Sequence, residues 1–275
     1  IIGGIFSGSL SLISDAFHNF SDSMAIIISY IAIKLGEKDN SLKHTFGLKR
    51  AEILAALLNS SILIGVICYL FYESVRKFLN PEPIAGNIMF IVAIIGLIGN
   101  ILSLILLQNS SKENLNIKSA YLHMLSDALS SVAVIIGALS IIYFKIYWID
   151  PVITIIIGLY TLKGSFTILK NSVHILMEGS PNDIDLDEIK IQIEKIDKVQ
   201  NVHHIHLWNV GEKDIFIELH VVVPDILLSY TEEIRVKIEE ILKKSNINHI
   251  TIQFETDNVC TNKNILCRLE DFNGI

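Results

Sequence analysis

The sequence predicts a polytopic α-helical membrane protein with six transmembrane helices, the first truncated here, followed by a cytosolic α+β domain of element order αββαβ. Hydrophobic residues make up 51% of the 275 residues and charged residues only 19%, whereas a soluble domain carries about 25% charged residues. The charge is unevenly spread. Residues 1–172 hold 12 basic and 10 acidic residues, a net charge of +2, and the rest hold 10 basic and 19 acidic residues, a net charge of −9. We therefore expect a membrane domain over 1–175 and a cytosolic domain over 176–275.

This composition excludes several classes of protein. A single soluble globule and a disordered chain do not fit the long apolar stretches. A nucleic-acid-binding protein would show a basic face, and the partners expected here include the lipid bilayer but no nucleic acid. Three cysteines provide no disulfide framework.

The membrane helices are expected where about 20 mostly apolar residues follow one another. The clearest span is 84–111, which contains no Asp, Glu, Lys or Arg. Residues 1–10 are apolar but too short to cross, and we interpret them as the tail of a truncated first helix. The remaining spans are expected at 12–33, 53–72, 128–144 and 148–169.

The short loops predict the orientation, because cytosolic loops carry an excess of Lys and Arg. If the chain starts inside, the inner loops and the segment after the membrane hold eight basic residues and the outer loops three. The inner set is Lys34, Lys38, Lys43, Lys49, Arg50, Lys112, Lys118 and Lys170; the outer set is Arg76, Lys77 and Lys145. Both termini are therefore placed in the cytosol.

The acidic C-terminal part of the chain is predicted to form a small two-layer α+β domain. Apolar residues at helical spacing predict a helix over 183–197, with Asp185 as a possible cap. Strands are expected over 202–210 and 215–223, an amphipathic helix over 230–244 and a last strand over 250–254.

Two membrane helices carry the same pattern, His-x-x-Ser-Asp. His18 and Asp22 form the first copy, and His123 and Asp127 form the second. Residues four apart lie on one helix face, so each pair offers an imidazole nitrogen and a carboxylate oxygen to one point. Two such helices facing each other would supply two nitrogens and two oxygens, which suits tetrahedral Zn²⁺.

The alternative is a pair of buried polar contacts that only hold helices together. An ionised Asp at bilayer depth costs about 2.5–3.5 kcal/mol on insertion scales, so two of them in matching positions favour a metal site. Metal loading requires neutral imidazoles and ionised carboxylates, so protons compete with the metal. Such a site suits metal–proton exchange.

These motifs, with several others, resemble the cation diffusion facilitator (CDF) family of zinc transporters. The resemblance covers nearly the whole chain and rests on these stretches: Ser14-Asp-Ala-Phe-His-Asn-Phe-Ser-Asp22, Thr45-Phe-Gly-Leu-Lys-Arg-Ala-Glu-Ile-Leu-Ala-Ala-Leu57, His123-Met-Leu-Ser-Asp127, Ile149-Asp-Pro151, Leu176-Met-Glu-Gly179 and His204-Ile-His-Leu-Trp208. It implies six membrane helices followed by a metallochaperone-like, ferredoxin-like cytosolic domain. It also implies a homodimer that exports Zn²⁺ from the cytosol in exchange for H⁺ by alternating access. The family's transport site matches His18, Asp22, His123 and Asp127.

The chain departs from the family at two loops. Residues 108–119 contain no histidine, so the histidine-rich loop of many zinc members is missing. A second site in the loop after the second helix is incomplete, because Leu48 stands where another His could follow His44. Asp39 could assist there.

The cytosolic domain offers weaker candidates. Alternate residues of a strand share a face, so His204 and His206 are expected on one face and His203 on the other. The resemblance implies that His206 and His220 bind zinc, and Glu255 is a candidate third ligand. His204, Cys260 and Cys267 are further candidates; for the two cysteines the reason is that some family members add cysteine ligands from that region. Zinc bound here would serve as a regulatory ligand by reducing repulsion between acidic domains.

Two other functions are considered. A membrane metalloenzyme would need an open coordination position, a base and a substrate pocket, and the short loops contain no hydrolase motif, so no enzyme is expected. A non-transporting zinc sensor or scaffold would not need four ligands at membrane depth. Co²⁺ and Cd²⁺ can use the same ligands as Zn²⁺. The composition favours a bacterial plasma membrane.

Overall fold

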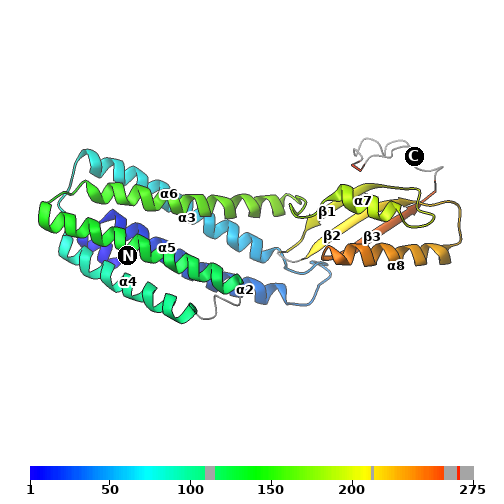
Figure 1. Ribbon diagram of the computed structural model, residues 1–275, viewed down its shortest axis with the longest axis horizontal. Helices are drawn as coiled ribbons and strands as arrows, with labels where there is room; N and C mark the ends of the chain where they lie inside the picture. Colours follow the sequence, from blue (N-terminus) through cyan, green and yellow to red (C-terminus); the bar gives the residue numbers. More distant parts are fainter. Residues whose placement is uncertain (109–114, 212–213, 257–264, 267–275) are drawn as a thin grey trace. The chain divides into compact units, whose positions relative to one another are not determined.

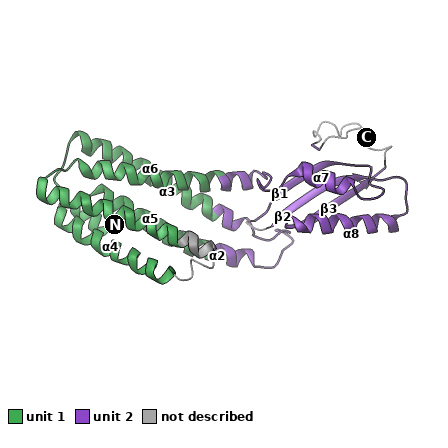
Figure 2. Ribbon diagram, viewed as in Figure 1, with its two compact units in different colours: residues 1–30, 55–170 green, residues 31–54, 171–275 purple. Residues whose placement is uncertain are grey.

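The computed structural model describes residues 1–108, 115–211, 214–256 and 265–266 (Figure 1). The chain divides into two compact units (Figure 2). The first comprises Ile1–Tyr30 and Ala55–Lys170, and the second comprises Ile31–Leu54 and Asn171–Ile275. Each is described by itself below.

The first unit is built from helices. After a short α1, five long helices follow, as the apolar stretches predict, and α2, α3 and α6 continue into the second unit. Their bounds are α1 Ile2–Ser7, α2 Leu10–Gly36, α3 Ala51–Leu79, α4 Gly86–Leu107, α5 Leu115–Phe144 and α6 Ile149–Leu176. Among the described residues, four helices (α3, α4, α5 and α6) are long and apolar enough to cross a membrane. The 27-residue α2 is the helix that carries Asp15, His18 and Asp22.

The core of this unit lies where α4, α5 and α6 meet. Met89, Val134 and Ala138 are completely buried there. At Gly137 a Cβ atom would lie 2.6 Å from Ile153 Cδ1, closer than carbon atoms approach, so glycine allows α5 to lie directly against α6. Close packing of this kind fixes α5, which carries His123 and Asp127.

The start of α2 is held by a carboxylate from another helix. Asp150, fully buried in the first turn of α6, accepts hydrogen bonds from the backbone N–H of Leu10 at 2.7 Å and of Ser11 at 3.2 Å. It also accepts from the hydroxyl groups of Ser9 at 2.6 Å and Ser11 at 2.5 Å. The first N–H groups of a helix have no partner within the helix, and an anion there also complements the helix dipole. Asp150 therefore fixes where α2 begins.

Replacing Asp150 by alanine is expected to destabilise the protein by about 3 kcal/mol, because four buried donors lose one charged acceptor. Thr154→Ala is the matched control one turn along α6, since the Thr154 hydroxyl donates only to the Asp150 carbonyl of its own helix. Thermal unfolding in detergent micelles measures both. Equal melting temperatures for the two variants would contradict this role of Asp150.

The second unit contains the predicted αββαβ order. The elements are α7 Leu186–Glu194, β1 Asn201–Asn209, β2 Ile215–Val222, α8 Leu228–Lys244 and β3 Ile247–Glu255. The expected cap is confirmed, because the Asp185 side chain accepts from the backbone N–H of Asp187 and Glu188. The sheet is mixed, with β1 antiparallel and β3 parallel to the central β2.

One face of the sheet packs against helices and forms the apolar core of this unit. The other face lies outside that core. Apolar side chains of the first face pack with α7 and α8, the helices beside the sheet in Figure 1. This core includes Ile193, Val202, Leu219, Ile238 and Leu242. The opposite face of β1 and β2 carries histidines, and it is called the histidine face below.

Candidate metal centres

The two His-x-x-Ser-Asp motifs meet in the first unit. α2 supplies His18 and Asp22, α5 supplies His123 and Asp127, and in both helices the four-residue spacing puts imidazole and carboxylate one turn apart on the same side. One ligand atom from each of the four residues lies within 4.8 Å of every other. The structure thus brings together all four residues that the sequence singles out.

The four groups form a closed ring in which imidazole and carboxylate alternate. His18 Nε2 lies 3.5 Å from Asp22 Oδ2 and 3.4 Å from Asp127 Oδ1. His123 Nε2 lies 3.0 Å from Asp22 Oδ2 and 3.7 Å from Asp127 Oδ2. Tetrahedral Zn²⁺ with bonds of about 2.0–2.2 Å separates its ligand atoms by about 3.3–3.6 Å. The four nitrogen–oxygen separations bracket that range, which is consistent with a zinc ion between the four groups.

Burial adds to the case for a cation here. Asp127 is 2% exposed, and its Oδ2 accepts no hydrogen bond from the described residues. A buried carboxylate oxygen without a donor is rare in folded proteins and costly in a membrane helix. A metal ion between the four groups would remove that cost.

The histidine face of the cytosolic sheet differs from the prediction. His203 pairs with His220 across the strands, but His206 pairs with Glu218, so β1 has one residue more than β2 in between. This β-bulge puts consecutive residues on the same side, and His204 has the positive φ of 50° that accompanies it. The expectation that His203 points away from the face of His204 and His206 is wrong, because strict alternation does not survive a bulge.

The bulge changes which histidine meets Glu255. His203 Nε2 lies 3.4 Å from Glu255 Oε2, and His220 Nδ1 lies 2.7 Å from Glu255 Oε1. His203, His220 and Glu255 form one group with metal-ligand spacing, and His204, Glu218 and His220 form another. His206, which the resemblance implied as a ligand, is in neither group and is exposed, whereas His203, which the alternation placed on the other face, is in the first group.

Burial favours the neutral form of two of these imidazoles. The pKa of His203 is lowered mainly by burial, with Glu255 opposing and His220 adding to the effect. The pKa of His204 is lowered by burial and by the neighbouring His206 and His220. Neutral imidazoles are the form that binds metal.

Stability of the metal-free sheet is expected to fall in acid. A histidine of lowered pKa binds protons more weakly in the folded than in the unfolded state, whose value is about 6.5, so protonation favours unfolding as pH drops through that value. Trp148→Phe leaves Trp208 as the sole tryptophan to report urea unfolding in micelles. We expect the urea concentration at the midpoint of unfolding to be lower at pH 5.5 than at pH 7.5, and this difference to be smaller in the His203→Gln protein. An equal difference in the two proteins would contradict the contribution of His203.

Four further candidates were predicted from the sequence. Asp39 and His44 are exposed in the loop between α2 and α3, and neither belongs to a metal-ligand group among the described residues. Cys260 and Cys267 lie outside the described residues.

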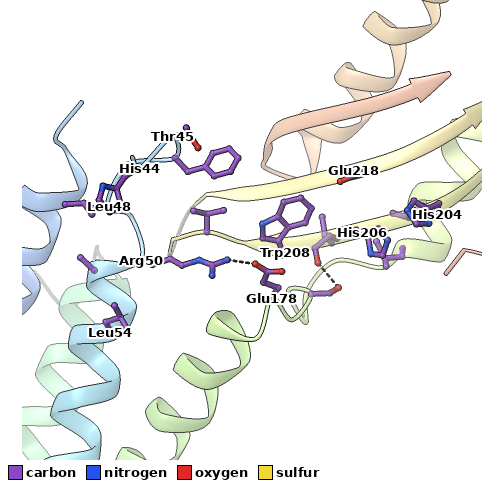
Figure 3. Close-up of a pocket in the computed structure, with 18 of the residues that line it drawn as sticks. His44, Thr45, Leu48, Arg50, Leu54, Glu178, His204, His206, Trp208 and Glu218 are labelled. Atoms are coloured by element: carbon purple, nitrogen blue, oxygen red, sulfur yellow. Dashed lines mark hydrogen bonds and ion pairs between the residues drawn. The ribbon is translucent and has the colours of Figure 1, made fainter. Parts of the chain in front are cut away.

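A cavity of about 920 Å³ opens beside the histidine face within the second unit (Figure 3). Its wall includes His204, His206 and Glu218 of the sheet and residues 43–48 from the loop before α3. Ion pairs hold that segment in place. Lys49 Nζ lies 2.7 Å from Asp214 Oδ1, and Arg50 Nη2 lies 2.9 Å from Glu178 Oε1.

Two family models match the chain. Residues 1–177 match the cation efflux transmembrane domain, and residues 181–257 match the cytoplasmic domain of cation efflux proteins.

Curated relatives are similar over most of their length. The chain is 41% identical to the cadmium, cobalt and zinc/H(+)-K(+) antiporter of Bacillus subtilis, over 97% of this chain and 87% of that protein. It is 40% identical to the zinc transporter ZitB of Escherichia coli, over 81% of this chain and 72% of that protein. It is 38% identical to the metal cation efflux system protein CzcD of Cupriavidus metallidurans, over 93% and 81%.

Proposed function

Because the chain belongs to the cation efflux, or cation diffusion facilitator, family, we propose that it is a multi-pass membrane transporter that exports Zn²⁺ from the cytosol in exchange for protons. The observation that carries this proposal is the ring of ligand atoms from His18, Asp22, His123 and Asp127. The relatives named for zinc, cadmium and cobalt transport support the same cargo class.

The chemistry of the site explains the exchange. Each ligand must give up its proton, or hold none, before it can bind the ion. A site that faces the cytosol binds Zn²⁺ and releases protons there. When it faces the other side, protons displace the ion from imidazole and carboxylate. The four groups act as ligands of the cargo, and no bond of a substrate is made or broken, so we assign no enzymatic reaction.

The protein is proposed to be a homodimer in a bacterial plasma membrane, with both termini of each chain in the cytosol. The cytosolic unit is proposed to regulate transport. Its metal ligands are proposed to be His203, His220 and Glu255, with the distances given above in support. A bound divalent cation would reduce repulsion between two domains of net charge −9. A His220→Ala/Glu255→Ala protein that kept the same zinc dependence of turnover would contradict the regulatory role.

The direction of transport is tested in cells. Expression in a zinc-sensitive bacterium that lacks its own exporters is expected to restore growth in zinc and to lower cytosolic zinc. Asp22→Asn, produced at the same level in the membrane, should restore neither. Growth in zinc without lower cytosolic zinc would fit a sensor or scaffold and would contradict the exporter.

A further inference from the structure

His204, Glu218 and His220 bring three possible metal ligands together on the sheet, beside the group formed by His203, His220 and Glu255. We propose that they form a second binding position for a zinc-like divalent cation, and that His220 is common to both positions. This second position is separate from the membrane site, and it shares only His220 with the regulatory ligands proposed above.

The backbone brings these side chains together. Glu218 and His220 are two apart on β2 and so share a face, and the bulge in β1 turns His204 toward that same face. The ring centroids of His204 and His220 are 4.5 Å apart. Two imidazoles and one carboxylate are the ligands that Zn²⁺ takes in open, three-residue sites.

Glu255 prepares His220 for this position. A carboxylate only accepts hydrogen bonds, so the proton between His220 Nδ1 and Glu255 Oε1, 2.7 Å apart, belongs to Nδ1. In that tautomer Nε2 is the nitrogen that carries the lone pair, so it is the atom that would bind a metal. A histidine that binds metal through one nitrogen and donates to a carboxylate through the other is the usual arrangement at metal sites.

The two positions differ in access. His204 and Glu218 line the cavity of about 920 Å³, whereas His203 is 1% exposed (Figure 3). A cation from solution can therefore reach the second position through the cavity. His206, exposed beside His204 with ring centroids 4.5 Å apart, lies on the way in.

Sharing His220 has a consequence for occupancy. A neutral imidazole has one lone pair for a metal, so one ion at a time uses His220. The ion therefore occupies one position or the other. Glu255 is a ligand in the first position and the group that orients His220 in the second.

The test measures Zn²⁺ affinity by competition with a chelating dye, on the whole protein in micelles with Asp127→Ala to remove the membrane site. His203 belongs to the first position alone and Glu218 to the second alone. We expect His203→Gln to weaken binding about 10-fold, and His203→Gln/Glu218→Gln to weaken it about 10-fold more. The matched control is His203→Gln/Glu240→Gln, in which an exposed glutamate on α8 is replaced. Its Zn²⁺ affinity should equal that of His203→Gln.

Two results would overturn the proposal. One is a His203→Gln protein that binds Zn²⁺ no better than His220→Ala. The other is equal affinity of the Glu218→Gln and Glu240→Gln double variants. If circular dichroism shows that His203→Gln does not fold, Glu255→Gln disables the first position instead and still accepts the hydrogen bond from His220. Because the membrane site is removed in every variant, the result does not depend on transport.

Discussion

Asp127→Asn is expected to reduce zinc flux on the order of 100-fold or more. Asp127 is the most buried of the four proposed ligands of the transport site, and each of its oxygens lies within 3.7 Å of an imidazole nitrogen. Asparagine keeps the size and shape but supplies no charge, so the divalent ion at this depth would lose half of its anionic ligands. Zinc uptake into vesicles measures the loss of flux, and zinc bound per protein at equilibrium measures the loss of binding.

Asp39→Asn is the matched control, since it removes an exposed carboxylate that belongs to no metal-ligand group of the described chain. It should transport as the unaltered protein does. An Asp127→Asn protein with undiminished flux would show that the ring of four groups is not the transport site.

His18→Asp is expected to change which metal is carried. The substitution converts a set of two nitrogens and two oxygens into one nitrogen and three oxygens. Carboxylate oxygens suit Mn²⁺, whereas imidazole suits Zn²⁺ and Co²⁺. We expect the ratio of Mn²⁺ to Zn²⁺ transport to rise about 10-fold, measured as competing uptake in the same vesicles.

The control for this change is His44→Asp, in the loop after α2, which should leave the ratio unaltered. An unaltered ratio in His18→Asp, with transport retained, would mean that selectivity is set elsewhere than at the first ligand of the site.

Sequence reasoning succeeded where one residue spacing determines one geometry. The uncharged stretches predicted α3 to α6 because a membrane helix must be apolar over its length. His18 and Asp22, like His123 and Asp127, could be paired because residues four apart on a helix always lie on one face. The cap at Asp185 followed from the same kind of local rule.

It failed where geometry depends on pairing between distant segments. The bulge between His203 and His206 arises from the unequal lengths of paired β1 and β2, and no residue of β1 alone reveals it. For that reason strict alternation placed His203 on the face away from His204 and His206. The role of Asp150 was also out of reach, because its partners at the start of α2 are about 140 residues away. The Ile149-Asp-Pro151 motif indicated a resemblance but no contact.

The most direct test of the account follows zinc and protons at once. The protein is reconstituted in vesicles that hold a zinc dye and a pH dye, and Zn²⁺ is added outside under an imposed proton gradient, beside an Asp127→Ala control. We predict zinc entry with proton movement in the opposite direction, and neither in the control. If the protein binds Zn²⁺ while neither dye responds, the antiporter is contradicted, and a zinc sensor or scaffold takes its place.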